Sequence, residues 1–342
     1  MRPMLTVPVR SLGFLIGTAL AAGAQGADLY WFGNGTSLGG TGAWSNTGTN
    51  WNATTTGPAS TAWISDSTAI FDSPSGTVTV ENGGITVGDG LSITTGIKFQ
   101  TSPYTLIGGT VTLAGPYSAA NPITVNSSTA TISSVRAGSK GLTKFGPGVL
   151  QLGATNTYTG ETVIEGGVLT VTGSINPSEK IYVGYTNPDT HLLITNGGSA
   201  AVTNGYLGVE SASSNNTATV SGASSLWTNS TDLVIGYAGS SNALTVSGQG
   251  TVSTTFGYLG WGTDADNNSV LVTGSSSTWS NSDVLYIGFD GSSNSFSVES
   301  GGVASSAKDT VIGFNSNSAS NSLKVKDSGS TFQVTGGSPF KV

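Results

Sequence analysis

The sequence predicts an all-β protein, a right-handed parallel β-helix with about 26 residues in each coil. A first observation is the pentapeptide Asn-x-apolar-x-Val, which recurs five times at an almost constant step of about 26 residues. A second is a short strand ending in glycine, whose steps alternate between short and long, so that coils come in pairs. A fixed step of this size, filled with strand patterns and no helical pattern, is typical of a solenoid.

The pentapeptides place one residue set on the inside of the predicted coils. They begin at Asn216, Asn242, Asn268, Asn294 and Asn321. Within each, the asparagine, the apolar residue and the valine share a face, because strand side chains alternate. The asparagine series resembles the asparagine ladder of pectate-lyase-like β-helices, in which stacked inward amides satisfy turn backbone. We therefore expect a structural role for it.

The glycine-ended strands supply the second side of each coil. Their glycines are Gly184, Gly208, Gly236, Gly260, Gly288 and Gly313. The residues that follow are Tyr185, Val209, Tyr237, Trp261, Phe289 and Phe314, and strand alternation predicts that they form an internal aromatic stack. A third strand per coil is indicated by Gly250–Val252, by Gly302 and Val303, and by the series Trp227, Trp279 and Phe332.

The opposite face of the glycine-ended strand is the candidate binding surface. Tyr182, Tyr206, Tyr258 and Tyr286, with Val234 and Val311 between and after them, are predicted to point outward in one column. Exposed tyrosine columns suit glycans or protein partners. The alternative is that tyrosine is simply a good strand former on an amphipathic surface.

Composition limits the class of partner. The 342 residues include 51 glycines, no cysteine and only 8% charged residues, about a third of the usual charged fraction. Apolar residues nevertheless recur at regular intervals, and this regularity excludes disorder for 140–337. After the predicted signal segment, one arginine and eight lysines face 18 acidic residues. That acidity argues against nucleic acid and anionic membranes.

The N-terminus has the pattern of a secretory signal. Arg2 and Arg10 precede or flank a mostly apolar run, Ser11–Ala22, and small-x-small cleavage sites follow at 22–24 and 24–26. The run is too short to span a membrane as a helix. We expect a signal peptide over 1–26, an N-terminal cap over 27–75, irregular β-helix coils over 76–140, a distinct repeat over 141–171, regular coils over 172–337 and a tail over 338–342.

The predicted cap holds four of the seven tryptophans, Trp31, Trp44, Trp51 and Trp63. The first coil of a solenoid has no neighbour on one side, so its apolar face and its strand edge need a cover. We interpret these tryptophans as that cover. A carbohydrate-binding aromatic platform is the alternative.

Residues 141–171 carry a family resemblance. The blocks Gly-Leu-Thr-Lys from Gly141, Asn-Thr-Tyr-Thr-Gly from Asn156 and Gly-Gly-Val-Leu-Thr-Val from Gly166 stand in order. They resemble the passenger-associated transport repeat, also called the autotransporter-associated β-strand repeat, of bacterial type V secretion passengers. The resemblance implies an exported β-helix, displayed on or released from a Gram-negative cell, that passes through the secretion machinery of the outer membrane. Autotransporters end in a membrane β-barrel. This sequence stops at Val342, which leaves open a truncated passenger or a complete secreted protein.

Catalytic and metal-binding candidates are few. Asp283 and Asp309, one coil apart, are the only acids at equal offsets in adjacent coils, and such a pair could act on a glycosidic bond; acids before strands are also ordinary turn residues. Arg136 lies too many coils away to serve them as a basic catalyst, and His191 is predicted to be a surface residue. The acidic turn Asp264–Asn268 lacks the pattern of a calcium loop. We expect no cofactor and no metal.

These observations favour an exported, non-enzymatic surface passenger in adhesion or cell-surface structure, with a glycan or host surface as the possible ligand and an open oligomeric state. A polysaccharide-active enzyme on the same scaffold, a glycosidase or lyase, is the alternative. Ice binding needs flat Thr-x-Thr arrays. The outward slots read Leu193 and Thr195, then Thr245 and Ser247, then Ser297 and Glu299, which makes that function a poor fit.

Overall fold

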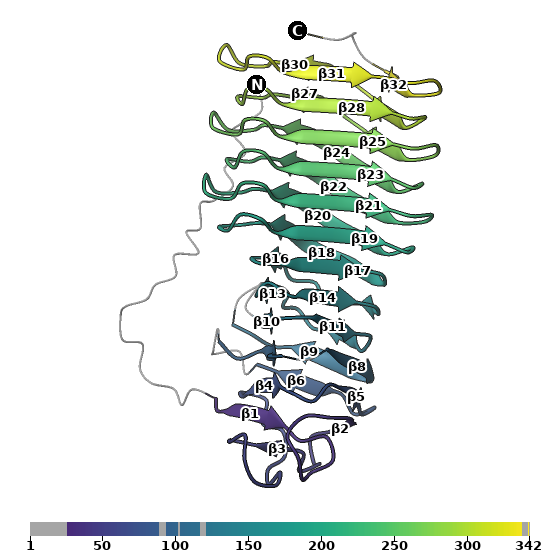
Figure 1. Ribbon diagram of the computed structural model, residues 1–342. Coiled ribbons are helices and arrows are strands. Elements are labelled where there is room, and N and C mark those ends of the chain that lie inside the picture. The colour runs from purple at the N-terminus through teal and green to yellow at the C-terminus, as the bar shows by residue number, and fades with distance from the viewer. Residues whose placement is uncertain (1–25, 89–93, 102, 117–120, 337–340, 342) are drawn as a thin grey trace.

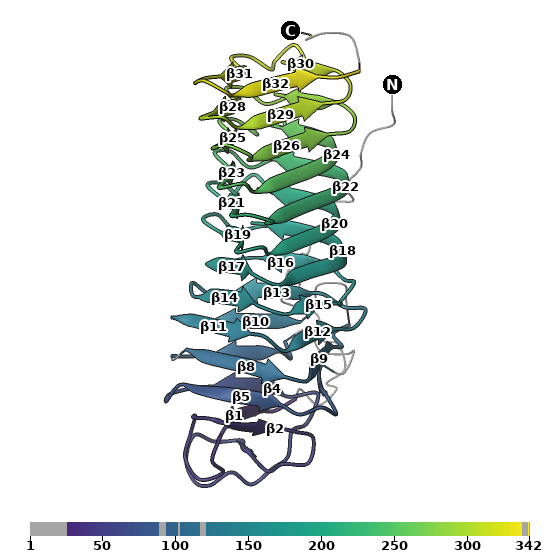
Figure 2. The same ribbon diagram turned by 90° about the vertical axis from the view of Figure 1, so that its right-hand side faces the viewer.

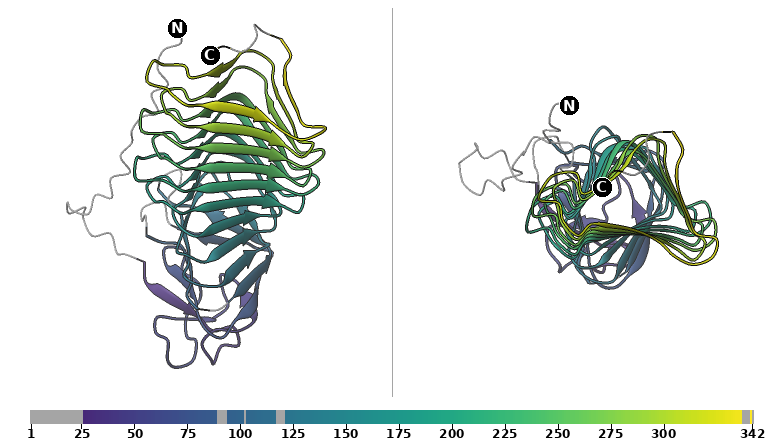
Figure 3. Two further views of the ribbon diagram at one scale, coloured as in Figure 1. Left: turned by 45° about the horizontal axis from the view of Figure 1, so that its top comes forward. Right: turned by 90° about the horizontal axis from the view of Figure 1, so that it is seen from above.

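A computed structural model describes residues 26–88, 94–101, 103–116, 121–336 and 341. Over these residues the chain is all strand, and it winds into a parallel β-solenoid of about 10 turns (Figures 1 and 2). Viewed from above, the regular coils lie on top of one another (Figure 3). The predicted fold class is confirmed. The predicted signal peptide lies almost wholly outside the described residues, as does the tail except for Lys341.

Two large sheets form the sides of the solenoid. The twelve-stranded sheet contains β2 (Gly42–Trp44), β5 (Gly76–Val80), β8 (Tyr104–Gly108), β11 (Thr129–Ile132), β14 (Val149–Leu152), β17 (Val168–Val171), β19 (His191–Thr195), β21 (Thr217–Ser221), β23 (Ala243–Ser247), β25 (Ser269–Thr273), β28 (Ser295–Glu299) and β31 (Ser322–Val325). Every neighbouring pair in it is parallel.

The seventeen-stranded sheet is the largest, and bulges or irregularities interrupt the pairing of its longest strands. It contains β1 (Asp28–Trp31), β3 (Trp51–Asn52), β4 (Thr68–Phe71), β7 (Ile97–Phe99), β10 (Pro122–Val125), β13 (Leu142–Phe145), β15 (Thr155–Asn156), β16 (Thr162–Ile164), β18 (Ser174–Val183), β20 (Ser199–Leu207), β22 (Leu226–Ile235), β24 (Thr251–Leu259), β26 (Thr278–Asn281), β27 (Leu285–Ile287), β29 (Val303–Ser306), β30 (Thr310–Ile312) and β32 (Thr331–Val334). A small third sheet contains β6 (Ile85–Val87), β9 (Thr110–Leu113) and β12 (Val135–Ala137).

The coils are not all the same length. Thr129 pairs with Val149 and Val149 with Val168, so the coils at this level are short. Later coils are longer, because His191 pairs with Thr217 and the next pairings repeat this step of about 26 residues. The solenoid is therefore narrow where the 141–171 repeat lies and wider in the regular coils after it.

The asparagines form the predicted ladder. Each main-chain N–H donates to the side-chain oxygen of the next asparagine: Asn216 to Asn242 at 3.0 Å, Asn242 to Asn268 at 2.8 Å, and Asn268 to Asn294 at 2.8 Å. The step from Asn294 to Asn321 is also 2.8 Å. The first four of these asparagines are buried. Because a buried backbone N–H without a partner is costly, the ladder stabilises the turn that precedes each strand of the twelve-stranded sheet.

The glycine that ends each glycine-ended strand packs against an asparagine of the ladder. Gly236 has a φ of 75°, which side-chain-bearing residues rarely adopt, and a Cβ there would lie 2.2 Å from the amide nitrogen of Asn268. Gly208 stands in the same relation to Asn242, with a Cβ contact of 2.1 Å. Glycine is required at this corner both for the turn and for the space that the amide occupies.

Large and small side chains alternate along the core column of the predicted third strand. Trp227 pairs with Ala200 on one side and with Val252 on the other, and Trp279 lies between Val252 and Ala304. Both indoles are buried. Coils about 4.8 Å apart leave no room for an indole in every layer. This alternation gives a packing reason for coils that repeat in pairs.

The four N-terminal tryptophans form the predicted cap. Trp31, Trp44, Trp51 and Trp63 are all buried, with ring centroids 4.9–5.1 Å apart in edge or tilted contacts. The strand pair β1–β3 is antiparallel, and it closes this end (Figure 1). Because the rings are covered, the alternative of a tryptophan platform for carbohydrate is wrong.

Candidate functional site: an aromatic ridge on the outside of the regular coils

Two aromatic rows meet on the outer surface of the regular coils, and together we call them the aromatic ridge. The strand row is Tyr182, Tyr206, Tyr258 and Tyr286, and the loop row is Tyr185, Tyr237, Trp261, Phe289 and Phe314. Tyr182, Tyr206, Val163, Val209 and Val234 form a hydrophobic cluster separate from the main core, against which Tyr185, Tyr237, Tyr258 and Trp261 pack.

The prediction that the loop row is internal is wrong. At Gly236 the left-handed backbone interrupts the strand alternation, so that Tyr237 turns outward instead of into the core. Its ring then contacts Tyr206 of the strand row, edge to face with centroids 6.2 Å apart. The glycine itself was the sequence signal for this arrangement, because it permits the positive φ.

The strand row is less exposed than predicted, because the loop row covers it. Tyr182 is 5% and Tyr206 4% exposed, and both are therefore buried. Tyr258 and Tyr286 are intermediate in exposure. In the loop row Phe314 is 50% exposed. The prediction of a solvent-exposed column is thus wrong for Tyr182 and Tyr206, and the accessible part of the ridge lies toward its C-terminal end.

The rings of the ridge stack on one another along the solenoid axis. Trp261 and Phe289 are 4.5 Å apart at an interplanar angle of 4°, and Phe289 and Phe314 are 4.7 Å apart at 18°. Tyr258 and Tyr286 are parallel within 1° at 5.2 Å. Most ring faces are therefore covered by neighbouring rings, and the ring rims and the exposed part of Phe314 are accessible to a ligand.

Burial and nearby carboxylates favour the neutral form of Tyr206 and Tyr286. Burial raises the pKa of Tyr206, and the negative charge of Asp232 raises it further. The pKa of Tyr286 is raised by burial first and then by Asp283 and Asp309. The ridge is thus an uncharged hydrogen-bonding and apolar surface at physiological pH.

The repeat at 141–171 uses its motif residues for internal support. The Lys144 ammonium donates to the carbonyls of Phe145, Gly146 and Gly166 at 3.0, 2.7 and 2.9 Å. Burial lowers the pKa of Lys144 to about 8. Asn156 accepts from the N–H of Arg136 and donates to two carbonyls, at 3.0, 2.9 and 2.9 Å. These contacts join successive narrow coils.

Arg136 is the least expected feature of these coils. Its side chain is fully buried, and its three guanidinium nitrogens have no hydrogen-bond partner among the described residues. Burial lowers its pKa to about 9, and the neighbouring Tyr158 opposes that shift. A buried cation without full pairing lowers stability. Sequence patterns missed the burial of Arg136 and Lys144 because charged residues are normally placed outside.

The enzyme candidates occupy surface ion pairs. Asp283 is 2.6 Å from Lys308, and Asp309 is 2.5 Å from Lys341. His191 is half-buried on β19, with its Nδ1 2.8 Å from the Thr217 hydroxyl, as expected for an outward residue. Asp266 accepts the N–H of Ser292 at 2.6 Å, a turn contact. Among the described residues, no group of three or more His, Cys, Asp or Glu could hold a metal ion.

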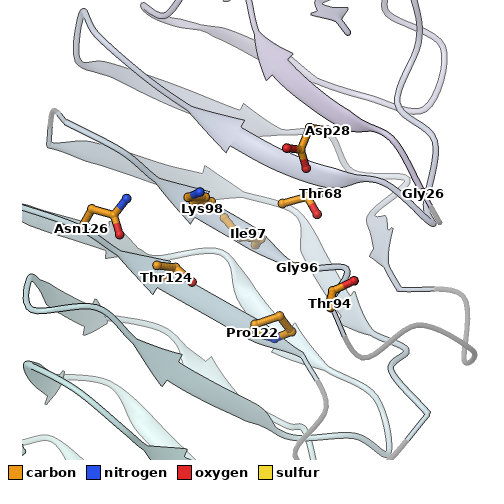
Figure 4. Close-up of a pocket in the computed structure, with 10 residues that line it drawn as sticks. All are labelled: Gly26, Asp28, Thr68, Thr94, Gly96, Ile97, Lys98, Pro122, Thr124 and Asn126. Atoms are coloured by element: carbon orange, nitrogen blue, oxygen red, sulfur yellow. The ribbon is translucent and has the colours of Figure 1, made fainter. Parts of the chain in front are cut away.

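A polar hollow of about 380 Å³ lies over β1, β4, β7 and β10, near the cap (Figure 4). Asp28, Thr68, Lys98, Thr124 and Asn126 line it. Asp28 is the only acid among its described lining residues. Acid–base cleavage of a glycosidic bond requires two carboxyl groups, so the hollow does not supply that chemistry.

Fold and repeat together are similar to those of β-helical passengers of bacterial autotransporters. Residues 142–171 match the family model described as Passenger-associated-transport-repeat, which confirms the resemblance predicted from the motif blocks. Over 168 residues, 47% of this chain, the sequence is 40% identical to the protein named Adhesin BmaC autotransporter, from Brucella suis biovar 1 (strain 1330). The matched segment covers 4% of that relative's length. No solved structure gives a significant match.

The repeat and the relative support export to the cell surface or outer membrane, or secretion. In the part of the chain that the structure describes, no helix has the length and apolar character needed to cross a membrane.

Proposed function

We propose that this protein is an exported, non-enzymatic passenger that attaches to a surface through its aromatic ridge. The observation that carries the adhesive role is the 40% identity over 168 residues to a protein named as an adhesin. The ion pairs that hold Asp283 and Asp309 also favour a role without catalysis.

The proposed attachment surface is the accessible end of the ridge, made by Tyr258, Tyr286, Trp261, Phe289 and Phe314. Its ring rims are repeated from coil to coil at about 4.8 Å. Such a surface suits many weak contacts to an uncharged glycan or to a host-surface protein, because each repeat adds a similar small contribution. Tyr182 and Tyr206 continue the strand row in the preceding coils, where they contribute to packing and not to attachment, since both are buried.

The test is the triple substitution Tyr258→Ser, Tyr286→Ser and Phe314→Ser. Beads coated with this variant should adhere to host cells or to arrayed glycans less than beads coated with the parent protein. The matched control is Tyr258→Phe with Tyr286→Phe, which keeps the ring stack and removes only the hydroxyls. A variant with a parent-like β-sheet spectrum and undiminished adhesion would place attachment elsewhere.

A further inference from the structure

The twelve-stranded sheet has an almost charge-free composition. Its first ten strands, β2 to β25, contain no Asp, Glu, Lys or Arg. The two charged residues of the sheet, Glu299 and Lys324, lie in its last two strands, β28 and β31. The seventeen-stranded sheet, in contrast, includes Asp28, Lys98, Glu179, Lys180 and Asp232.

Small hydroxyl side chains dominate the outer face of this uncharged sheet. Thr217, Thr219 and Ser221 point outward from β21, and Ala243, Thr245 and Ser247 do so from β23, in the alternating burial pattern of both strands. The strands are stacked in register along the solenoid (Figure 1). A flat surface of short side chains allows another sheet to approach closely over its whole length.

A neutral face matters for self-association because the chain as a whole is acidic. Beyond the predicted signal segment, the chain has 18 acidic residues against eight lysines and one arginine, a net charge of −9. Two copies repel each other wherever acidic surfaces meet. The outer face of the twelve-stranded sheet, whose charged residues are Glu299 and Lys324, is where they can meet with the least repulsion.

We propose that two copies of this protein pair face to face through their twelve-stranded sheets. With a two-fold axis between β21 and β23, eight strands of each copy overlap, β14 to β31. Eight strands about 4.8 Å apart, each with about four residues of about 3.3 Å, give a face of roughly 500 Å². Two such faces bury about 1,000 Å², the lower end of the size range for a specific interface. The pairing does not depend on the proposed adhesive function, because it uses a different side of the solenoid from the ridge.

The outward column at the centre of the face suggests the register. It reads Leu193, Thr219, Thr245 and Leu271 on four successive strands. A two-fold axis along the strand direction, between β21 and β23, brings Leu193 of one copy opposite Leu271 of the other. The two threonines of one copy then face those of the other. At each end of this block a leucine of one copy faces a leucine of the other. No leucine therefore lies opposite a smaller threonine.

The first experiment measures the mass of the purified protein in solution over a range of concentrations. We expect a dimer, and we expect Thr219→Lys with Thr245→Lys to raise its dissociation constant at least about 100-fold, since like charges then face each other. The matched control is Ser253→Lys, a half-exposed outward position on β24 of the other large sheet. The control should remain dimeric.

A second experiment tests the register, using the absence of cysteine from the chain. Leu193→Cys and Leu271→Cys proteins are mixed and treated with a short bis-maleimide, and a covalent dimer carrying one of each is expected. A protein that is monomeric at all concentrations, or a dimer unchanged by the lysine pair, overturns the proposal. A third outcome also overturns it: the protein is monomeric, it sediments with an insoluble neutral polysaccharide, and the lysine pair abolishes that sedimentation. The face would then bind a polysaccharide and not a second copy.

Discussion

Replacing Val246 with Asp places a carboxyl group inside the stack of regular coils. Val246 is fully buried on β23, and its strand partners Val220 and Val272 lie above and below it in the same inward column. The side chain packs in the main hydrophobic core. The new carboxyl group therefore enters an apolar layer.

Two contributions set the size of the effect. Loss of the buried valine costs about 2 kcal/mol. Keeping the carboxyl group protonated at pH 7, when its ordinary pKa is about 3.9, costs about 4 kcal/mol more at about 1.36 kcal/mol for each pH unit. The sum of about 6 kcal/mol exceeds what most single substitutions cause. Because a solenoid is stabilised by neighbouring coils, the damage should begin locally.

The pH dependence separates charge burial from simple loss of packing. Burial raises the pKa of the new carboxyl group in the folded state above its unfolded value, so the charge-dependent part of the destabilisation is absent below about pH 4 and grows as pH rises. The loss of valine packing remains at every pH. Val246→Asn is the control, since it has nearly the same shape and no titration. Urea midpoints and protease resistance of 181–337 are measured at pH 3.5 and pH 7. Val298→Asp, in another coil, should behave alike. Unchanged resistance, or equal pH profiles for Asp and Asn, would refute the inward assignment.

The remaining predictions concern catalysis and the buried cations. The purified protein should not cleave pectin, alginate or other acidic glycans; an activity that disappears in Asp283→Asn with Asp309→Asn would support the enzyme alternative. Arg136→Met should raise the melting temperature at pH 7 by removing an unpaired buried charge, whereas Lys144→Met should lower it by leaving three carbonyls without their donor. Because burial lowers the pKa values of Arg136 to about 9 and Lys144 to about 8, the cost of their charges is fully present below pH 8 and falls as pH rises. The parent protein should therefore become more stable from pH 8 to pH 9.5, and this gain should be smaller in Arg136→Met. Lys324→Met, at an exposed position, is the control. A lower melting temperature for Arg136→Met than for the parent at pH 7 would contradict this account.

Periodic features were predictable from the sequence because each coil repeats the same local chemistry. The inward asparagine and valine of the pentapeptides follow from strand alternation alone, and Asn242 and Val246 lie where that alternation puts them. The loop row was mispredicted because alternation fails at a residue with positive φ. At Gly236 the chain turns, and Tyr237 therefore packs outside on Tyr206.

The burial of Lys144 in the narrow coils could not be predicted from the sequence pattern, for a different reason. Lys144 is buried because three carbonyls of neighbouring turns converge on its ammonium. That convergence depends on two short coils, which the longer period of the later chain does not indicate. Only the registers of β11, β14 and β17 place these turns above one another.

The repetition of the coils in pairs also affects how the ridge would bind a ligand. Val209 and Val234 interrupt its loop and strand rows, whereas Trp261, Phe289 and Phe314 form a continuous stack beyond them. A ligand that spans this stack contacts several similar rings at once. Loss of one ring therefore removes a small part of the total attachment, while loss of several removes a disproportionate part, because the contacts of one chain act at high effective concentration. Adhesion should fall more steeply with the number of ridge residues replaced than with the identity of any one of them.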